Sequence, residues 1–311
     1  MINLLPYAYR LSPEVRHAFE SKAQIVALET TVITHGLPEP ENLKLARNME
    51  AVVRNNGATP ATVGVLNGHI WIGMSEEQVQ DLAHLSSVHK ISRRDFGFVI
   101  ARKESGGTTV AGTLIAAHTA GIRILATGGI GGVHRGAPFD VSADLYELSR
   151  RPVIVVCAGA KSILDLPATL EVLETLGVPV VGYQTDVFPA FYARSSGLPV
   201  QMRAETPRDV AEIATAHWNL GLESAIVVVV PVPVDGALPK QEMESAITQA
   251  LADASELKIQ GKDATPFLLE RVSELTGRAS LQANLALLLN NAKIAAKIAR
   301  EYHRKLKRAV A

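Results

Sequence analysis

The sequence predicts an α/β protein with a mostly parallel central sheet and a helical C-terminal tail. Short β-branched runs alternate with longer amphipathic stretches along the chain, which is typical of parallel strands joined by helices. No repeat, low-complexity segment or linker rich in proline and glycine interrupts the sequence. We therefore expect a single domain spanning residues 1–311.

Strands are expected where β-branched runs are short and bounded by turn residues. They lie near residues 24–31, 60–66, 97–101, 122–127, 153–157, 178–183 and 225–230. Helices are expected where an amphipathic stretch begins at a capping residue or proline and ends at glycine. They lie near residues 13–21, 41–55, 75–84, 109–119, 142–149, 162–175, 207–219 and 240–254. The tail, residues 264–306, is expected to be helical with a break at Thr276–Gly277.

Composition excludes several classes of protein. Basic and acidic residues both number 31, so no net charge favours nucleic acid or an anionic membrane as the partner. The most apolar segment, residues 225–232, is far shorter than the roughly 18 residues of a membrane helix. The single cysteine, Cys157, excludes an intramolecular disulfide, and the N-terminus has no secretory signal pattern. We expect a cytoplasmic protein that binds a small molecule in a pocket, with Cys157 as a core residue.

Unusual residues follow three of the predicted strands. The first strand ends at Glu29 and two threonines, the second runs through Thr127 into a glycine-rich stretch with His134 and Asp140, and the third leads to Lys161 at the start of a predicted helix. In open α/β sheets, ligands bind outside the carboxyl ends of the strands. These residues are therefore expected to meet in one crevice.

Lys161 and the acidic residues each allow two interpretations. A desolvated lysine loses its proton more readily and attacks a carbonyl-like carbon, but a lysine at a helix start also binds phosphate. Asp140 and Asp144 would suit a helix cap, and equally a hard divalent cation held by one carboxylate and waters. His134 is either a substrate contact or a loop anchor.

Two further segments are candidates for binding an anion. Lys90 is followed closely by Arg93 and Arg94, which could hold a phosphate or form a solvated loop paired with Asp95. Residues 106–113 (GGTTVAGT) place glycines and hydroxyls at a helix start, where free amides attract anions. In the tail, Asn284 lies beside an apolar stripe and faces either the site or buried backbone.

The glycine-rich run lacks the acidic partner of a dinucleotide fingerprint, so we do not expect a nicotinamide or flavin dinucleotide bound in the Rossmann manner.

Eight motifs, taken in order, resemble the pseudouridine-5'-phosphate glycosidases, a family related to the indigoidine synthase A proteins. They are ALETTVITHG, HKISRRD, GTTVAGT, ATGGIGGVHRGA, FDVSADL, CAGAKSILD, VPVVGYQTD and TPFLLERVSELTG. The resemblance covers residues 12–303. It implies a three-layer α/β/α fold, a homotrimer, and reversible cleavage of pseudouridine 5'-phosphate into uracil and ribose 5-phosphate, physiologically in the direction of degradation.

The resemblance also implies roles for individual residues. Glu29 matches the proton donor, Lys161 the Schiff-base nucleophile, and Asp140 the ligand of a divalent metal, usually one Mn²⁺ per subunit. Positions that match substrate-binding or pocket-lining residues are Lys90, Val110, Thr127, His134, Ser142, Ala143, Asp144 and Asn284. Two alternatives remain open: a Schiff-base aldolase acting on another sugar phosphate, and a sugar-phosphate sensor that has lost turnover.

Overall fold

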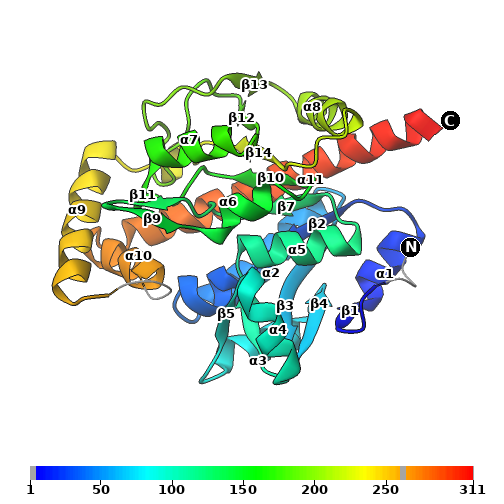
Figure 1. Cartoon of the computed structure of the whole chain (residues 1–311), viewed down its shortest axis with the longest axis horizontal. Helices are drawn as coiled ribbons and strands as arrows, with labels where there is room; N and C mark the ends of the chain where they lie inside the picture. Colours follow the sequence, from blue (N-terminus) through cyan, green and yellow to red (C-terminus); the bar gives the residue numbers. More distant parts are fainter. Residues whose placement is uncertain (1–4, 260–263, 311) are drawn as a thin grey trace.

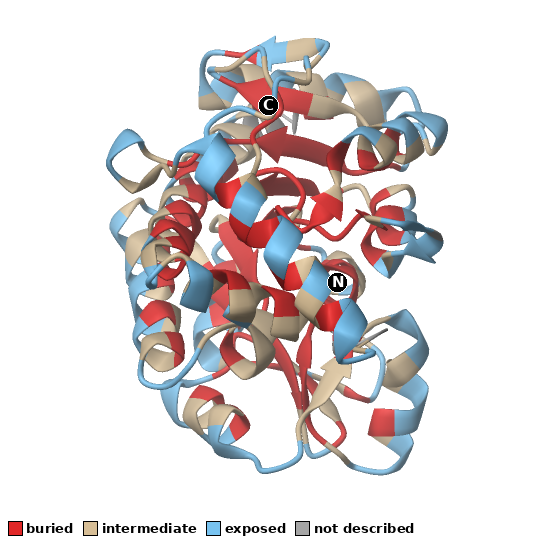
Figure 2. Ribbon diagram, turned by 90° about the vertical axis from the view of Figure 1, so that its left-hand side faces the viewer, coloured by how far each residue is buried: buried red, intermediate tan, exposed pale blue. Residues whose placement is uncertain are grey.

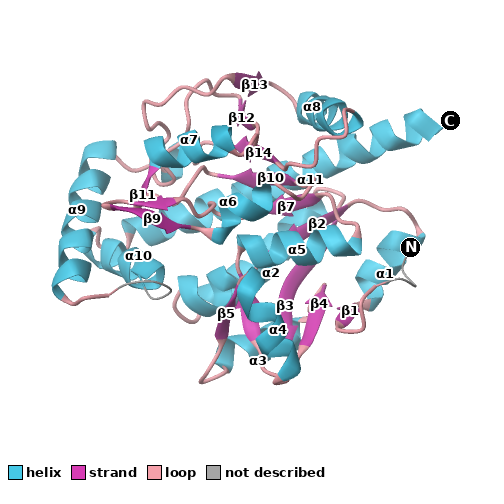
Figure 3. Cartoon of the chain, viewed as in Figure 1, coloured by secondary structure: helices cyan, strands magenta, loops and turns pink. Residues whose placement is uncertain are grey.

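Helices cover both faces of a mostly parallel sheet in the computed structural model, which describes residues 5–259 and 264–310 (Figures 1 and 3). In spatial order, the path through the main sheet is β1 (Tyr9–Leu11), β4 (His69–Ile72), β3 (Thr59–Leu66), β2 (Ile25–Leu28), β7 (Ile124–Ala126), β10 (Ile154–Cys157), β14 (Ile226–Val229), β12 (Val180–Tyr183) and β13 (Met202–Ala204). From β3 to β13 every neighbouring pair on this path is parallel. The predicted fold class is therefore confirmed.

Smaller elements extend this framework beside the site. β6 (Gly106–Thr108) pairs antiparallel with β3 and parallel with β5 (His89–Ile91). A separate three-stranded sheet contains β11 (Leu164–Asp165), β8 (Val133–His134) and β9 (Ala137–Val141). These strands are two to five residues long, which is too short for a periodic pattern, and they were not predicted.

The helices form the two outer layers of the molecule. They are α1 (Pro13–Glu20), α2 (Glu41–Asn55), α3 (Glu76–His84), α4 (Phe96–Ala101), α5 (Val110–Ala120), α6 (Ala143–Leu148), α7 (Leu166–Thr175), α8 (Pro207–Asn219), α9 (Lys240–Glu256), α10 (Ala264–Leu275) and α11 (Ala279–Val310), with short turns of helix at η2 (Val32–Gly36), η3 (Arg93–Asp95) and η4 (Val234–Gly236). α5 and α6 pack together on one face, whereas α11 crosses the other face between α2 and α8. No helix among the described residues is long and apolar enough to cross a membrane.

Two of the predicted secondary-structure elements are wrong in type or in starting residue. The strand expected at 97–101 is α4, because Ser92 and Asp95 form a capping box that starts η3 and the chain continues from η3 as a helix. The helix expected from residue 162 begins only at Leu166, because Leu164 and Asp165 pair with β8 and the Asp165 side chain caps α7. The break in the tail at Thr276–Gly277 is confirmed by the gap between α10 and α11.

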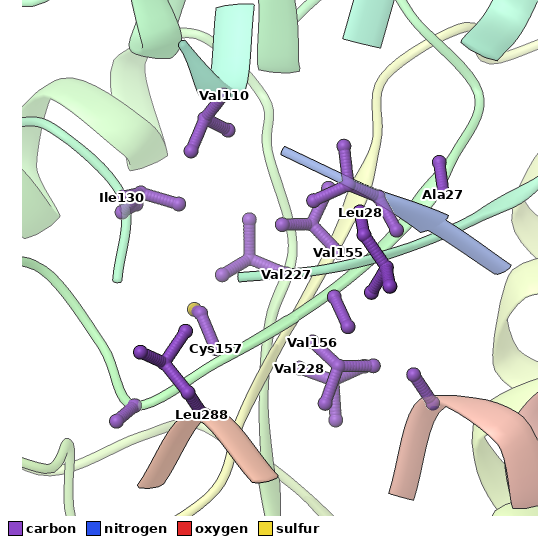
Figure 4. Close-up of a cluster of buried hydrophobic side chains, with 14 of the residues drawn as sticks. Ala27, Leu28, Val110, Ile130, Val155, Val156, Cys157, Val227, Val228 and Leu288 are labelled. Carbon is purple, nitrogen blue, oxygen red and sulfur yellow. The ribbon is translucent and has the colours of Figure 1, made fainter. Parts of the chain in front are cut away.

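The core extends over both faces of the central strands, toward α5 and α6 on one side and α11 on the other. Every residue of β2, β10 and β14 is buried, and Figure 2 shows these strands inside a shell of helices whose outer faces are exposed. In Figure 4, Leu288 of α11 lies close to Cys157 at the end of β10. Burial raises the pKa of the Cys157 thiol to about 12, so this cysteine behaves as a small core residue.

Candidate active site

A cavity of about 480 Å³ opens beyond the carboxyl ends of β2, β7 and β10. These three strands are parallel neighbours, so the residues that follow them meet at one edge of the sheet. The cavity lining includes Glu29, Lys90, Val110, His134, Asp140, Ser142, Ala143, Asp144, Lys161 and Asn284. Thr127, the remaining candidate, is fully buried behind this lining.

Glu29 is the first residue after β2 and is only 9 % exposed. Its Oε1 accepts a hydrogen bond of 2.8 Å from the Thr127 hydroxyl at the end of β7. Burial raises the pKa of the Glu29 carboxyl above its ordinary value, although the charge of Lys161 and the Thr127 hydrogen bond act in the opposite direction. A carboxyl group in this environment retains its proton to higher pH than an exposed one.

Buried threonines hold the backbone next to Glu29. The Thr30 hydroxyl donates to the Val63 carbonyl at 2.7 Å and accepts from the Thr108 amide at 2.9 Å. The Thr108 hydroxyl donates to the same carbonyl. These bonds join the end of β2 to β3 and β6, so the direction in which Glu29 leaves its strand is set by three strands.

The π-turn η2 follows directly and brings His35 to the cavity wall. The ring Nδ1 of His35 lies 2.7 Å from the Thr34 hydroxyl. Single π-turns are frequent at functional sites. Sequence reasoning did not select His35, because the pattern of VITHG contains no signal for a π-turn.

Lys161 lies in the loop after β10 and is half-buried. Gly159 adopts a positive φ of 88°, which a glycine tolerates without a steric penalty. Ala160 then bridges to Ile130, and the Lys161 amide donates to the Ile130 carbonyl at 3.0 Å. The expectation that Lys161 begins a helix is therefore wrong: it lies on an irregular segment tied to the glycine-rich loop.

Asn291 of α11 is a site-supporting residue that sequence reasoning missed. It is fully buried, and its amide donates to the Thr127 carbonyl at 2.8 Å. Asn284, seven residues earlier on the same helix, lines the cavity instead. A second asparagine at i+7 on an apolar stripe was the available signal, because this spacing places both on one helix face.

Asp140 and Asp144 differ sharply in environment. Asp140 lies on β9 and is exposed at the cavity, and α6 is capped by Ser142, so the interpretation of Asp140 as the helix cap is wrong. Asp144 is buried, and its two carboxylate oxygens accept from the Ala111 amide at 2.8 Å and the Gly131 amide at 2.7 Å. Asp144 thus ties the start of α5 to the glycine-rich loop.

The donor set at the cavity suits a cation held largely by water. No group of three or more histidine, cysteine, aspartate or glutamate side chains among residues 5–259 and 264–310 is arranged to hold a metal. Asp140 supplies one exposed carboxylate beside an open cavity. Hard divalent cations take oxygen ligands and retain waters, so this carboxylate fits a hydrated Mn²⁺ ion.

Basic residues gather at the part of the cavity formed by β5 and η3. Lys90, Arg93 and Arg94 all line it. Arg93 forms an ion pair with the buried Glu147, which also accepts from Arg151 at 3.1 Å. Arg94 lies 3.6 Å from Asp95, as the solvated-loop interpretation expected, yet its side chain is 84 % exposed and remains accessible.

Comparisons with known proteins agree along nearly the whole chain. The family described as "Indigoidine synthase A like protein" matches residues 14–301. Pseudouridine-5'-phosphate glycosidase of Geobacillus kaustophilus is 53 % identical over 93 % of this chain and 97 % of that protein. The Escherichia coli protein of the same name is 47 % identical over 97 % of this chain and 98 % of its own length.

Two solved structures have the same fold. An indigoidine synthase A-like protein from Thermotoga maritima superimposes with a TM-score of 0.88 at 38 % identity, covering 95 % of this chain and 97 % of that one. The prealnumycin C-glycosynthase AlnA, in complex with ribulose 5-phosphate, gives a TM-score of 0.90 at 34 % identity, covering 97 % and 99 % of the two chains.

Proposed function

The chain belongs to the indigoidine synthase A-like family, and we propose that it cleaves the carbon–carbon glycosidic bond of pseudouridine 5'-phosphate, releasing uracil and ribose 5-phosphate. The observation that carries this proposal is the presence of Glu29 and Lys161 in the lining of one cavity. Relatives of this name that are about half identical over nearly their whole length support it.

The bond to be broken explains why both groups are required. A carbon leaving group departs only when its electron pair is delocalised and then protonated, so direct attack of water on the sugar is too slow. An amine bonded to the anomeric carbon provides an electron source and forms an iminium ion as the base leaves. Covalent catalysis of this kind divides one difficult step into several easier ones.

The proposed sequence begins with opening of the ribose ring. Glu29 gives its proton to the ring oxygen as the bond between that oxygen and the anomeric carbon breaks, and Nζ of Lys161 bonds to the anomeric carbon. Nζ then loses a proton to water, which frees its lone pair. The carbon–carbon bond breaks next: its electron pair goes to C5 of uracil, which takes up a proton from water, while the nitrogen lone pair forms the iminium ion. Water hydrolyses the iminium ion, which releases ribose 5-phosphate, restores the amine and returns a proton to Glu29.

The Glu29 environment supports its role as the acid. An acid that works near neutral pH must retain its proton there, and burial raises the pKa of Glu29 in the required direction. The Thr127 hydroxyl donates to Oε1, which orients the carboxyl group toward the cavity edge. General acid catalysis of this type contributes about 10²- to 10⁴-fold to the rate.

The phosphate and metal positions complete the proposal. Lys90, with Arg94 nearby, would bind the phosphate group through charge-assisted hydrogen bonds. In the segment 106–113, Gly106–Thr108 form β6, whereas Thr109 caps α5 and lines the cavity with Val110, so only this helix start would meet the phosphate. Asp140 would hold one Mn²⁺ per subunit, which supplies positive charge to stabilise the departing uracil ring. A homotrimer and a cytoplasmic location remain predictions from the family resemblance.

Borohydride trapping tests the covalent step. The enzyme is incubated with ribose 5-phosphate, reduced, digested and analysed by mass spectrometry. A pentose phosphate adduct on the peptide containing Lys161, absent from a Lys161→Met variant, is the expected result. Liberation of the pyrimidine by Lys161→Met at the wild-type rate would refute the mechanism. Release of uracil from pseudouridine 5'-phosphate separates this function from an aldolase and from a sensor.

A further inference from the structure

Arg135 lies in the turn between β8 and β9, and it lines a second cavity with Leu164 and Glu244 rather than the active-site cavity. Its Nε donates to the Leu164 carbonyl at 3.1 Å, and its Nη2 donates to the Ser162 carbonyl, also at 3.1 Å. Ser162 follows Lys161 directly in the loop, and Leu164 begins β11 three residues after Lys161. One guanidinium group therefore holds this loop at two points.

Glu244 of α9 holds the guanidinium group from the other side. Its carboxylate oxygens accept from Nη1 at 2.9 Å and from Nη2 at 3.3 Å. The hydrogen bond from Arg135 lowers the pKa of the Glu244 carboxyl below its ordinary value, which favours the carboxylate form. The planar fork of arginine can serve two carbonyls and a carboxylate together, whereas a lysine ammonium lacks this geometry.

Backbone bonds hold the loop on either side of Ser162: Leu164 and Asp165 pair with β8, and Ala158 donates to the Gly128 carbonyl. The Lys161 amide bonds to Ile130, and the Leu164 amide bonds back to the Lys161 carbonyl. The hydroxyl of Ser162 is buried and has no hydrogen-bond partner among residues 5–259 and 264–310. Without Arg135, the Ser162 carbonyl would lose a charge-assisted hydrogen bond, and the backbone next to Lys161 could shift.

We propose that Arg135 is a positioning residue for Lys161, and that it keeps the amine at bonding distance from the anomeric carbon by clamping the Ser162 and Leu164 carbonyls. The inference rests on the proposed role of Lys161 as the nucleophile. A displacement of about 1 Å in a reacting group costs up to about 10²-fold in rate. Substrate affinity depends on other parts of the cavity, so the effect falls on the rate of covalent bond formation.

The test measures how fast the adduct forms. Wild type and Arg135→Lys are mixed with saturating ribose 5-phosphate, reduced with borohydride at timed intervals, and the adduct at Lys161 is quantified by mass spectrometry. We expect the rate constant of Arg135→Lys to fall about 10- to 100-fold. In steady-state assays with pseudouridine 5'-phosphate, kcat should fall while KM changes less than about threefold. Arg203→Lys, which alters a surface ion pair with Asp186 and Glu205, is the matched control and should leave both values unchanged.

Exchanging the charges of Arg135 and Glu244 distinguishes two effects of Arg135: its hydrogen bonds to the loop carbonyls and its ion pair with Glu244. In Arg135→Glu/Glu244→Arg the ion pair can re-form, but no guanidinium group reaches the two carbonyls from position 135. We expect the thermal midpoint to recover relative to Arg135→Glu alone, while the rate of adduct formation stays low. Recovery of that rate would overturn the proposal, as would a wild-type rate in Arg135→Lys. If the wild-type enzyme itself forms no adduct, the proposed function fails rather than the clamp.

Discussion

The Thr127 hydroxyl donates a hydrogen bond of 2.8 Å to Oε1 of Glu29, and so links the carboxyl ends of β7 and β2 inside the protein. Both residues directly follow their strands. The parallel pairing of β2 with β7 places Leu28 opposite Ala126, which brings the two following side chains within bonding distance. The hydrogen bond between Thr127 and Glu29 is thus a consequence of the register between β2 and β7.

Glu29→Gln should retain the fold and lose about 10²- to 10⁴-fold in kcat, because glutamine has the shape of the acid but cannot supply the proton. The measurement is release of uracil from pseudouridine 5'-phosphate at neutral pH. Circular dichroism of the same preparation serves as the folding control. Full turnover by this variant would remove Glu29 from the mechanism.

The same substitution should change how stability depends on pH. Below the ordinary pKa of 4.5, the carboxyl group is protonated in both folded and unfolded chains. Above 4.5 the unfolded chain ionises first, because burial raises the pKa of Glu29 in the folded protein. The wild type therefore loses stability relative to Glu29→Gln as pH rises, until the folded carboxyl group also ionises. Thermal midpoints measured from pH 4 upward should diverge in this direction, and a constant difference would contradict the prediction.

Thr127→Val should shift the alkaline decline of kcat/KM to higher pH. Its hydroxyl lowers the pKa of Glu29 by donating to the carboxylate, so its removal should raise that pKa further. The acid then stays protonated to higher pH, and the alkaline decline of kcat/KM should shift upward. Thr127→Ser keeps the donor and should leave this decline at the same pH as in the wild type. A shift of equal size in both variants would point to packing rather than to the hydrogen bond.

Removal of divalent metal should abolish turnover, and Mn²⁺ should restore it. Asp140→Asn should raise the Mn²⁺ concentration required for half-maximal activity, because an amide oxygen is a weaker ligand for a hard cation than a carboxylate. Since Asp140 is exposed, the Asp140→Asn protein without metal should have the same thermal midpoint of unfolding as the wild type. If turnover is unchanged after removal of metal by a chelator, the proposed metal site at Asp140 is wrong.

Asp144→Asn should lower the free energy of unfolding, whereas Asp140→Asn should affect only the requirement for metal. Asp144 accepts from two backbone amides, and an asparagine side chain offers only one acceptor atom, so one buried amide loses its partner. Leaving a buried donor unsatisfied costs about 1–3 kcal/mol of unfolding free energy. Urea titration measures this loss, and Asp140→Asn is the matched comparison. An unchanged midpoint would show that Asp144 does not tie the two segments together.

The sequence was most informative where a residue's neighbours along the chain determine its conformation. β2, β10 and β14 are uninterrupted apolar runs, so they were predicted, and the residues just beyond such strands must lie at one sheet edge. The strand expected at 97–101 is wrong because the FGFVI sequence is compatible with a strand or a helix. The capping box at Ser92, four residues before Phe96, favours the helix.

Residues that act across long separations could not be found this way. Arg135 and Glu244 are 109 positions apart, and Asn291 reaches a carbonyl 164 positions away. The i+7 spacing from Asn284 indicates the helix face on which Asn291 lies, but no local pattern identifies the partner of either residue, because tertiary packing creates these pairs. His35 was missed for a different reason, since a π-turn has no sequence signature that distinguishes it from a loop.

The position of α11 determines when, during synthesis of the chain, the active-site cavity can form. Glu29 lies near the beginning of the chain, whereas Asn284 and Leu288 on α11 help to line the same cavity, and Asn291 supports it from behind. α11 follows every strand of the sheet in chain order. A polypeptide that ends before α11 therefore lacks a wall of the cavity, and the site can be assembled only after α11 has been synthesised.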